Sequence, residues 1–267
     1  MSKIKVFCFG FGQVAKYFVK KIIKEKQDLE LNVSTRKKTD TFLFEGLDLN
    51  SYEFNEEKID KNINTKIKEA DFILVSIPPI NDEDIVLKNF KETIKETNPK
   101  WITYLSATSV YGNHNGAWVT EGSKTKPTTT SGIVRLKAEN QWLKFSNENN
   151  SPLQIFRLSG IYSVQNNILK RLLSGQARIV KKDNHFFSRI HIEDIANILF
   201  HSMKKFKSNK IFNISDEKPA SQEELSYYES KLLKVKIAIL LELNTLEDGI
   251  LKDFYTDSKK VNNQKVK

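Results

Sequence analysis

The sequence contains little cysteine and no long apolar run. Cys8 is the single cysteine among 267 residues, which excludes an internal disulfide and fits a reducing compartment. No stretch reaches the roughly 18 apolar residues that a membrane-spanning helix needs. The apolar run from Val6 to Val14 lacks a following small-residue cleavage pattern, so it does not resemble a secretory signal. We therefore expect a cytoplasmic protein without a membrane partner.

Acidic residues are outnumbered, because 33 Asp and Glu stand against 43 Lys and Arg and leave a net charge of +10. A positive charge of this size raises the hypothesis of nucleic-acid binding. The lysines are, however, spread along the chain and alternate with acidic or amide residues, as in Glu56-Glu57-Lys58. No basic run contains interleaved aromatic residues. We therefore expect a solvated lysine-rich surface and no nucleic-acid partner.

Histidine is also scarce. The four histidines show no metal-ligand spacing with one another or with Cys8, so no metal site is expected; they are His114, His185, His191 and His201. His191 precedes Asp194 at the start of a predicted helix, where an acidic residue favours the first turn. We interpret this pair as a structural helix start.

The N-terminus combines a strand pattern, a glycine turn and a helix pattern. Residues 3–9 are apolar and β-rich, as expected for a strand that is buried on both faces. Residues 10–15 then read Gly-Phe-Gly-Gln-Val-Ala. Apolar residues follow in columns spaced by four, such as Val14, Phe18 and Ile22, which predict an amphipathic helix. This order is typical of the first unit of a dinucleotide-binding fold.

Each position of the glycine turn has a physical role in that interpretation. Gly10 permits the tight turn, and Gly12 leaves room for a pyrophosphate to approach the backbone. Ala15 keeps the helix close to the strand. The free N–H groups at Gln13 and Val14 and the positive end of the helix dipole then face the phosphates.

The end of the second predicted strand bears on cofactor choice. Sites that prefer NAD place an acidic residue there to bind the ribose hydroxyls. Here Thr35 and Arg36 are followed by two lysines, Lys37 and Lys38, and no acid is present. An arginine beside hydroxyls can hold a 2′-phosphate, so NADP is favoured over NAD. The alternative is that Arg36 to Lys38 only form part of the lysine-rich surface.

A further candidate segment stands at the end of the predicted strand at 72–77. Ser76, Ile77 and Pro78 lie at the carboxyl end of that strand, where the ligand crevice of a Rossmann sheet lies. Two consecutive prolines, Pro78 and Pro79, give a rigid turn that suits packing against an adenosine or ribose. A plain structural turn is the alternative.

The remaining pattern alternates strands with helices and predicts an α/β protein. The expected fold is a Rossmann-type doubly wound parallel sheet with a small C-terminal substrate lobe. The expected division is residues 1–160 for the dinucleotide-binding domain and 161–267 for a partly interleaved smaller lobe. Further strands are predicted at 30–35, 41–44, 101–106, 153–158 and 210–214, and helices at 83–96, 132–147, 165–174, 192–204 and 221–233. Residues 113–130 are predicted to form a long loop.

Four segments resemble the NAD-dependent epimerase/dehydratase family of extended short-chain dehydrogenases. They occur in the family's order and cover about residues 3–215 together with the glycine turn. Within this family, the chain most resembles an atypical subgroup of bacterial proteins similar to YeeZ, which share the GAWV tetrapeptide. The segments are 104–112 (YLSATSVYG), 116–121 (GAWVTE), 157–162 (RLSGIY) and 187–196 (FSRIHIEDIA).

The resemblance also locates the family's catalytic positions. The family uses a Tyr-x-x-x-Lys pair and a Ser or Thr at the end of the fifth strand, with the Tyr as acid/base. Those positions fall on Ser131, Arg135 and Ala107, with Ser106 one residue before the last. Arg135 can still bind a ribose or phosphate but cannot act as a base, and Ser131 cannot readily replace a phenol. Ser106 and Arg135 are therefore candidate cofactor-binding residues, and the catalytic residues stay unassigned.

Two functions follow from the resemblance. The first is an NAD(P)-dependent enzyme of the epimerase/dehydratase or oxidoreductase type that acts on a nucleotide-sugar or similar polar small molecule. The second is a non-catalytic dinucleotide-binding sensor or regulator, as in NmrA-type proteins, which also lack the catalytic pair. A homodimer is compatible with both. Relatives continue beyond a stretch like residues 258–265, so a natural end and a truncated sequence both remain open at Lys267.

Overall fold

The computed structural model describes residues 3–37, 41–175, 177–207, 210–236, 239–242 and 255–267. The chain forms two compact units. The first unit comprises Met1–Ser106, Lys137–Arg157 and Ile192–Phe212, and the second comprises Ala107–Leu136, Leu158–His191 and Asn213–Lys267. The interleaving is more extensive than a boundary at residue 160 suggests, because the chain changes unit after residues 106, 136, 157, 191 and 212.

The first unit is built on an eight-stranded sheet in the order β12-β8-β6-β5-β1-β2-β4-β3. Its central strands β1, β2, β4, β5 and β6 pair in parallel, and β3 joins β4 antiparallel at the edge. The predicted α/β class and doubly wound sheet are confirmed. The strands are β1 (Ile4–Phe9), β2 (Leu29–Thr35), β3 (Phe42–Phe44), β4 (Leu47–Glu53), β5 (Phe72–Val75), β6 (Trp101–Ala107), β8 (Leu153–Leu158) and β12 (Lys210–Ile214).

The third parallel strand is not the segment expected from the sequence. The predicted strand at 41–44 is β3, a short edge strand, whereas the parallel neighbour of β2 is β4. Within β4, Asp48 and Asn50 are exposed while Leu49 and Ser51 are buried. Polar residues alternate with buried ones because successive side chains of a strand point to opposite faces. Because the residues of one face are polar, the segment contains no apolar run, and no strand was predicted there from the sequence.

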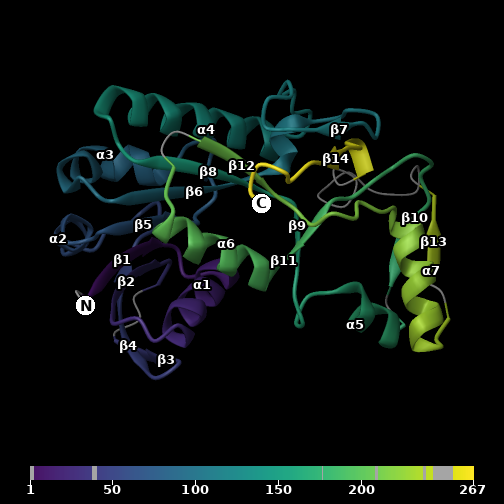
Figure 1. Ribbon diagram of the computed structural model, residues 1–267, viewed down its shortest axis with the longest axis horizontal. Helices are drawn as coiled ribbons and strands as arrows, with labels where there is room; N and C mark the ends of the chain where they lie inside the picture. Colours follow the sequence, from purple (N-terminus) through teal and green to yellow (C-terminus); the bar gives the residue numbers. More distant parts are fainter. Residues whose placement is uncertain (1–2, 38–40, 176, 208–209, 237–238, 243–254) are drawn as a thin grey trace. The chain divides into compact units, whose positions relative to one another are not determined.

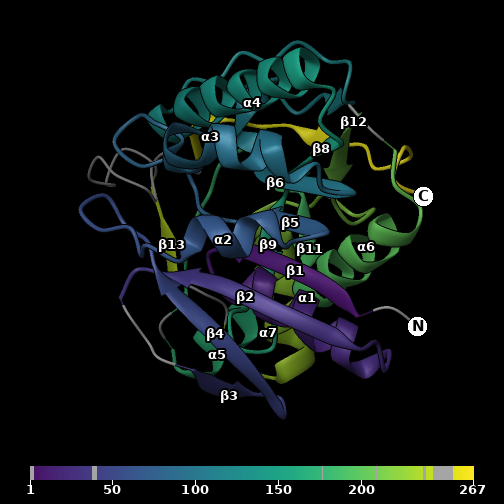
Figure 2. The ribbon, with the colours of Figure 1, turned by 90° about the vertical axis from the view of Figure 1, so that its left-hand side faces the viewer.

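Helices cover both faces of the sheet in the first unit. Figures 1 and 2 show α2 and α3 on one side and α1 and α6 on the other. Phe7 and Phe9 of β1 share a core with α2, α3 and the later turns of α4. None of the helices among the described residues is long and apolar enough to cross a bilayer. The helices are α1 (Gln13–Lys24), α2 (Ile63–Lys68), α3 (Ile85–Thr97), α4 (Thr130–Asn149) and α6 (Ile192–Lys204).

The described part of the second unit contains small two-stranded ribbons and the helices α5 and α7, together with the first turns of α4. Three two-stranded parallel ribbons pair β7 with β14, β9 with β11 and β10 with β13. The expected loop at 113–130 thus contains β7, a two-residue strand whose partner lies far along the chain. The elements are the 3₁₀ turn η1 (Thr108–Tyr111), β7 (Trp118–Val119), β9 (Gly160–Tyr162), α5 (Ile168–Leu173), β10 (Arg178–Val180), β11 (Arg189–His191), α7 (Gln222–Leu233), β13 (Ile239–Leu241) and β14 (Lys260–Val261).

Candidate functional site

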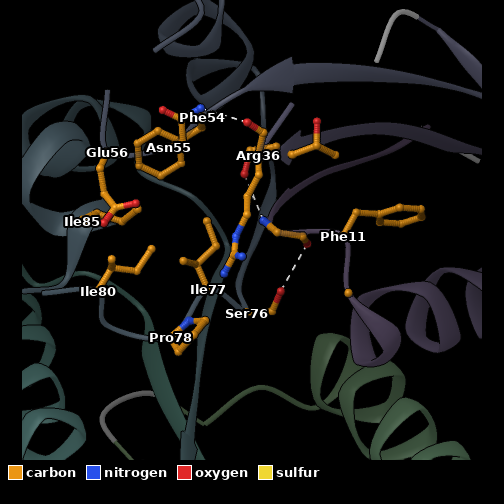
Figure 3. A pocket seen from close by; sticks show the side chains of 14 residues that line it. Phe11, Arg36, Phe54, Asn55, Glu56, Ser76, Ile77, Pro78, Ile80 and Ile85 are labelled. Atoms are coloured by element: carbon orange, nitrogen blue, oxygen red, sulfur yellow. Dashed lines mark hydrogen bonds between the residues drawn. The ribbon is translucent and has the colours of Figure 1, made fainter. Parts of the chain in front are cut away.

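The first unit contains a pocket of about 300 Å³ at the carboxyl ends of its parallel strands. Figure 3 shows the side chains that line it. Ligands of open α/β sheets bind at this end of the strands. The lining residues come from the segments after β1, β2, β4 and β5 and from the start of α3: Gly10, Phe11, Gly12, Ser34, Thr35, Arg36, Phe54, Asn55, Glu56, Ser76, Ile77, Pro78, Ile80 and Ile85.

The two glycines of the loop after β1 are needed for different structural reasons. Gly10 has a φ of +85°, and a Cβ there would lie 2.9 Å from Ser76 Oγ and 3.0 Å from Ile77 Cγ1. Gly12 has an ordinary φ of −77°, and a Cβ there would meet nothing within 4 Å. Gly10 is therefore required by the fold itself. Gly12 faces open space, so its lack of a side chain leaves room for a ligand at the backbone.

The glycine loop is hydrogen-bonded to both neighbouring strands. The Gly10 amide donates to Ser34 Oγ at 2.9 Å, at the end of β2. Ser76 Oγ, after β5, lies 2.9 Å from the carbonyl oxygen of Phe9 and 3.2 Å from that of Gly10. These bonds hold the ends of β1, β2 and β5 together at the pocket.

The first turn of α1 leaves its backbone donors without a side-chain cap. Gly12 is the N-cap residue and provides no side chain, and the first turn contains no acidic residue. The N–H groups of Gln13 and Val14 are thus among those that no helical carbonyl accepts. Ala15 is fully buried, which agrees with close packing of helix and strand. Gln13, Val14 and Ala15 do not line the pocket with side chains, so their expected contribution is through the backbone and close packing.

The segment after β2 places Arg36 at the pocket. Asn55 Nδ2 donates to the Arg36 carbonyl oxygen at 2.8 Å, and Thr35 Oγ1 donates to the Lys37 carbonyl oxygen at 2.7 Å. The Arg36 side chain is exposed and extends across the pocket toward Ile77 in Figure 3. The backbone is therefore held while the guanidinium remains accessible. Lys38 lies outside the described residues.

Several lining residues were not identified from the sequence. Phe54, Ile80 and Ile85 form an apolar wall together with Ile77, which the sequence did predict, and Asn55 and Glu56 belong to the segment after β4. Glu56 Oε1 accepts from Asn81 Nδ2 at 2.8 Å. An apolar wall with a few polar groups is typical of small-molecule sites. Because β4 was not recognised, the sequence offered no reason to place Phe54 to Glu56 at the strand ends.

The structure does not bring Ser106 to this pocket. Its hydroxyl is buried and donates to Glu139 Oε1 at 2.5 Å. The Glu139 carboxylate also accepts two hydrogen bonds from the Arg157 guanidinium, from Nε at 3.0 Å and from Nη2 at 2.7 Å. Ser106 is therefore engaged in a buried polar cluster of the first unit.

The family's catalytic positions lie in the second unit. Ser131 and Arg135 are one turn apart on α4, and Ala107 ends β6. Ser131 is exposed, and its hydroxyl oxygen lies 3.4 Å from Thr129 Oγ1. The fully buried Tyr111 hydroxyl donates to Asn213 Oδ1 at 2.7 Å. This tyrosine therefore has a structural partner inside the second unit.

Cys8 is fully buried in strand β1. Burial raises the pKa of the Cys8 thiol above its ordinary value, so this side chain is protonated at neutral pH. Across the part of the chain that the structure describes, no group of three or more His, Cys, Asp and Glu side chains gathers that could hold a metal ion.

The chain is similar in structure to several solved proteins. A conserved protein of unknown function from Silicibacter pomeroyi superposes with a TM-score of 0.84 at 26% identity, over 98% of this chain and 90% of that chain. The UDP-glucuronic acid 4-epimerase of Bacillus cereus in complex with NAD gives 0.77 at 14% identity, over 98% and 91%. The dTDP-glucose 4,6-dehydratase of Bacillus anthracis in complex with NAD gives 0.78 at 14%, over 98% and 89%.

Sequence comparison gives no relative of this kind. No protein-family model matches the chain, and no curated protein matches it. At 14% identity the likeness to the epimerase and the dehydratase establishes shared architecture and nothing about chemistry. Over nearly its whole length, the chain shares the fold of these two solved enzymes.

Proposed function

We propose that the chain is an NAD(P)-binding member of the NAD-dependent epimerase/dehydratase family, from the atypical YeeZ-like subgroup. The observation that carries the proposal is the pocket at the ends of β1, β2 and β5. This pocket in the first unit combines three features. They are Gly12 with open space beside its Cα, the N-terminus of α1 without a side-chain cap, and the accessible side chain of Arg36. The single buried cysteine supports a cytoplasmic location.

The residues present fit a dinucleotide. A pyrophosphate needs backbone donors and close approach, which the α1 N-terminus and Gly12 offer. The apolar wall that contains Phe54, Ile80 and Ile85 fits an adenine ring. When bound, such a cofactor supplies hydride transfer, and the chain supplies binding and orientation.

NADP is proposed as the preferred form. Arg36 follows β2, where a 2′-phosphate would lie in a Rossmann site, and no acidic residue occupies positions 34–37. A guanidinium forms paired hydrogen bonds to a phosphate, while a carboxylate at this place would repel it. The exposed Lys37 adds a second positive charge nearby.

We propose a nucleotide-sugar or a similar polar small molecule as the substrate. The epimerase and the dehydratase with the same fold act on UDP-glucuronic acid and dTDP-glucose, as their names state. The usual Tyr and Lys positions hold Ser131 and Arg135, so the reaction would need another proton donor or would proceed without one.

A non-catalytic sensor is the second candidate. It is favoured by one observation in particular, because the Tyr111 phenol, a hydroxyl close in sequence to the family's catalytic Ser or Thr position, donates to Asn213 and is fully buried. Such a protein would bind the dinucleotide and alter its affinity for a protein partner.

Calorimetric titration with NADPH, NADP, NADH and NAD tests the proposal. Wild-type protein should bind the NADP forms more tightly, Gly12→Asp should bind none, and Arg36→Glu should lose the NADP forms preferentially. Lys61→Glu provides a matched control, since it makes the same charge change on an exposed residue that does not line the pocket. Absence of binding to all four dinucleotides by wild-type protein would refute the proposal.

Turnover separates the two candidates. Oxidation or reduction of bound cofactor with a nucleotide-sugar, followed by absorbance at the nicotinamide band, supports the enzyme. Tight binding without turnover, together with a protein partner whose affinity changes with NADPH, supports the sensor.

A further inference from the structure

The glycine loop contains one bulky side chain, that of Phe11, at the rim of the pocket. Phe11 stands between Gly10 and Gly12, which have no side chains to hold the loop. In Figure 3 the Phe11 ring points away from Arg36 and Ile77. Any side-chain packing that orders the loop itself must therefore act through the Phe11 ring.

The Phe11 ring packs against the edge strand β3. Its centroid lies 5.9 Å from that of Phe42 and 5.1 Å from that of Phe44, with interplanar angles of 58° and 79°. Tilted and edge-on aromatic pairs at these distances are attractive beyond their buried area. Phe42 and Phe44 are half-buried, whereas Leu43 between them is 71% exposed, because alternate residues of a strand face opposite sides.

Two lysines of α1 extend this contact. Lys16 Nζ lies 5.8 Å from the Phe11 ring centroid, and Lys20 Nζ lies 5.9 Å from that of Phe44. Lys20 also forms an ion pair of 2.6 Å with Glu45 in the turn after β3. The hairpin of β3 and β4 is thereby joined to the first turns of α1 as well as to the loop.

Strand β4 of the same hairpin pairs with the strands on either side of the segment that contains Arg36. This segment connects β2 to β3, and β4 pairs with both strands, at Thr35↔Glu53 on one side and Phe42↔Leu49 on the other. The β3–β4 hairpin therefore contacts both parts of the proposed cofactor site.

We infer that β3 is an aromatic brace, formed by Phe42 and Phe44, that positions the glycine loop through Phe11. The inference rests on the proposed function for its effect on dinucleotide affinity. Glycine-rich backbone loses much conformational entropy when it is ordered. A loop that is ordered before the ligand arrives avoids that cost at binding. Phe42 and Phe44 do not line the pocket, so they act as positioning residues.

Hydrogen exchange of the cofactor-free protein tests the brace without reference to any ligand. Phe44→Ala should speed exchange of the amides of residues 10–16 relative to wild type, because local opening of the loop becomes easier. Leu43→Ala, on the outer side of the same strand, should leave those amides unchanged. Phe44→Tyr keeps the ring and should behave like wild type.

Titration with NADPH and NADH then tests the consequence. Phe44→Ala should bind both about tenfold more weakly, with unchanged preference between them, since the loop contacts the pyrophosphate that both share. Arg36→Glu should instead change the preference. A denaturant midpoint shows whether each variant folds, and Phe44→Leu, which keeps apolar volume, replaces Phe44→Ala if that variant does not.

The outcomes are separable. If wild-type protein binds neither dinucleotide, the proposed function fails, while hydrogen exchange still decides the brace. If folded Phe44→Ala exchanges and binds like Leu43→Ala, the brace is refuted. Faster exchange with weaker binding of both cofactors supports it.

Discussion

In the interior of the first unit, the Arg157 guanidinium donates hydrogen bonds to the Glu139 carboxylate from both Nε and Nη2. The two side chains are only 5% and 1% exposed. Ser106 adds a further donor to the same carboxylate at 2.5 Å. Glu139 thus holds both Ser106 and Arg157, and the cluster connects β6, α4 and β8.

Removal of one partner should be far worse than removal of both. Arg157→Met leaves a buried carboxylate without its countercharge, and we expect a loss of about 3–5 kcal/mol in the free energy of unfolding. The double variant Arg157→Met/Glu139→Leu should recover most of that loss, because no buried charge remains. Urea unfolding of wild-type protein and the two variants measures the difference, and a double variant no more stable than Arg157→Met would contradict the prediction.

An exposed ion pair on the same helix supplies the control. Lys144 and Glu148 are one turn apart on α4 and are separated by 3.7 Å, with both side chains largely solvated. Lys144→Met should change the free energy of unfolding by less than about 0.5 kcal/mol, since surface pairs contribute little.

The two glycines of the loop should respond in opposite ways to substitution. Gly10→Ala introduces a Cβ at positive φ and 2.9 Å from Ser76 Oγ, so we expect a loss of about 2 kcal/mol. Gly12→Asp places a good N-cap residue in open space at the positive end of α1. Its thermal midpoint should equal or exceed that of wild type. A Gly12→Asp variant that melts well below wild type would contradict this account.

Asp84 should be essential for the packing of α3 against α4. Its Oδ1 accepts from the amides of Val86 and Leu87, and its Oδ2 accepts from Trp142 Nε1 at 2.8 Å. Asp84→Ala removes the helix cap and leaves a buried indole N–H without its acceptor, so we expect about 2–4 kcal/mol of destabilisation. Ser221→Ala removes only the cap of α7, and about 1 kcal/mol is expected there. Equal losses in denaturant titrations would show that the indole bond is unimportant.

His185 should make stability fall in mild acid. Burial, with Lys182 and Lys259 nearby, lowers the pKa of its imidazole from 6.5 to about 4, while backbone groups of Tyr255 and Asp257 partly oppose the shift. Between pH 6.5 and 4 the His185 imidazole is protonated in the unfolded chain but stays neutral in the folded chain. Acidification through this range therefore lowers the free energy of unfolding. His185→Phe removes this titration and keeps the contacts with the Phe187 and Tyr255 rings.

Urea midpoints of wild-type protein and His185→Phe between pH 7 and 4 check this prediction. The difference between the two proteins isolates the histidine from the carboxylates that titrate below pH 5. Parallel curves would mean that the imidazole titrates normally in the folded protein.

The glycine loop could be predicted because its signals are local. A buried strand, a turn with two glycines and apolar columns on a helix are contained in residues 4–24, and the structure places them as β1, the loop and α1. The ends of β2 and β5 were found in the same way. Seven of the residues proposed for the cofactor site therefore line the pocket, namely Gly10, Gly12, Thr35, Arg36, Ser76, Ile77 and Pro78.

The remainder depends on pairing between distant segments. β7 and β14 are two-residue strands with register Lys260↔Trp118, and so short a strand has no periodicity to detect. Strand β4 could not be predicted because its solvent-facing residues Asp48 and Asn50 are polar. Without that strand, the sequence offered no reason to place Asn55 and Glu56 at the pocket. Ser106 was placed by resemblance alone, which could not reveal its bond to Glu139.

The order of the strands has a consequence for synthesis on the ribosome. β12, at one edge of the sheet, contains Lys210–Ile214, and the α6 helix that packs on α1 directly precedes it. The nascent chain can pair β1, β2, β4 and β5 early, but the β8 edge stays uncovered until residue 214 has emerged. Uncovered strand edges can pair with other chains, so the β8 edge is open to such pairing from the emergence of residue 158 until that of residue 214.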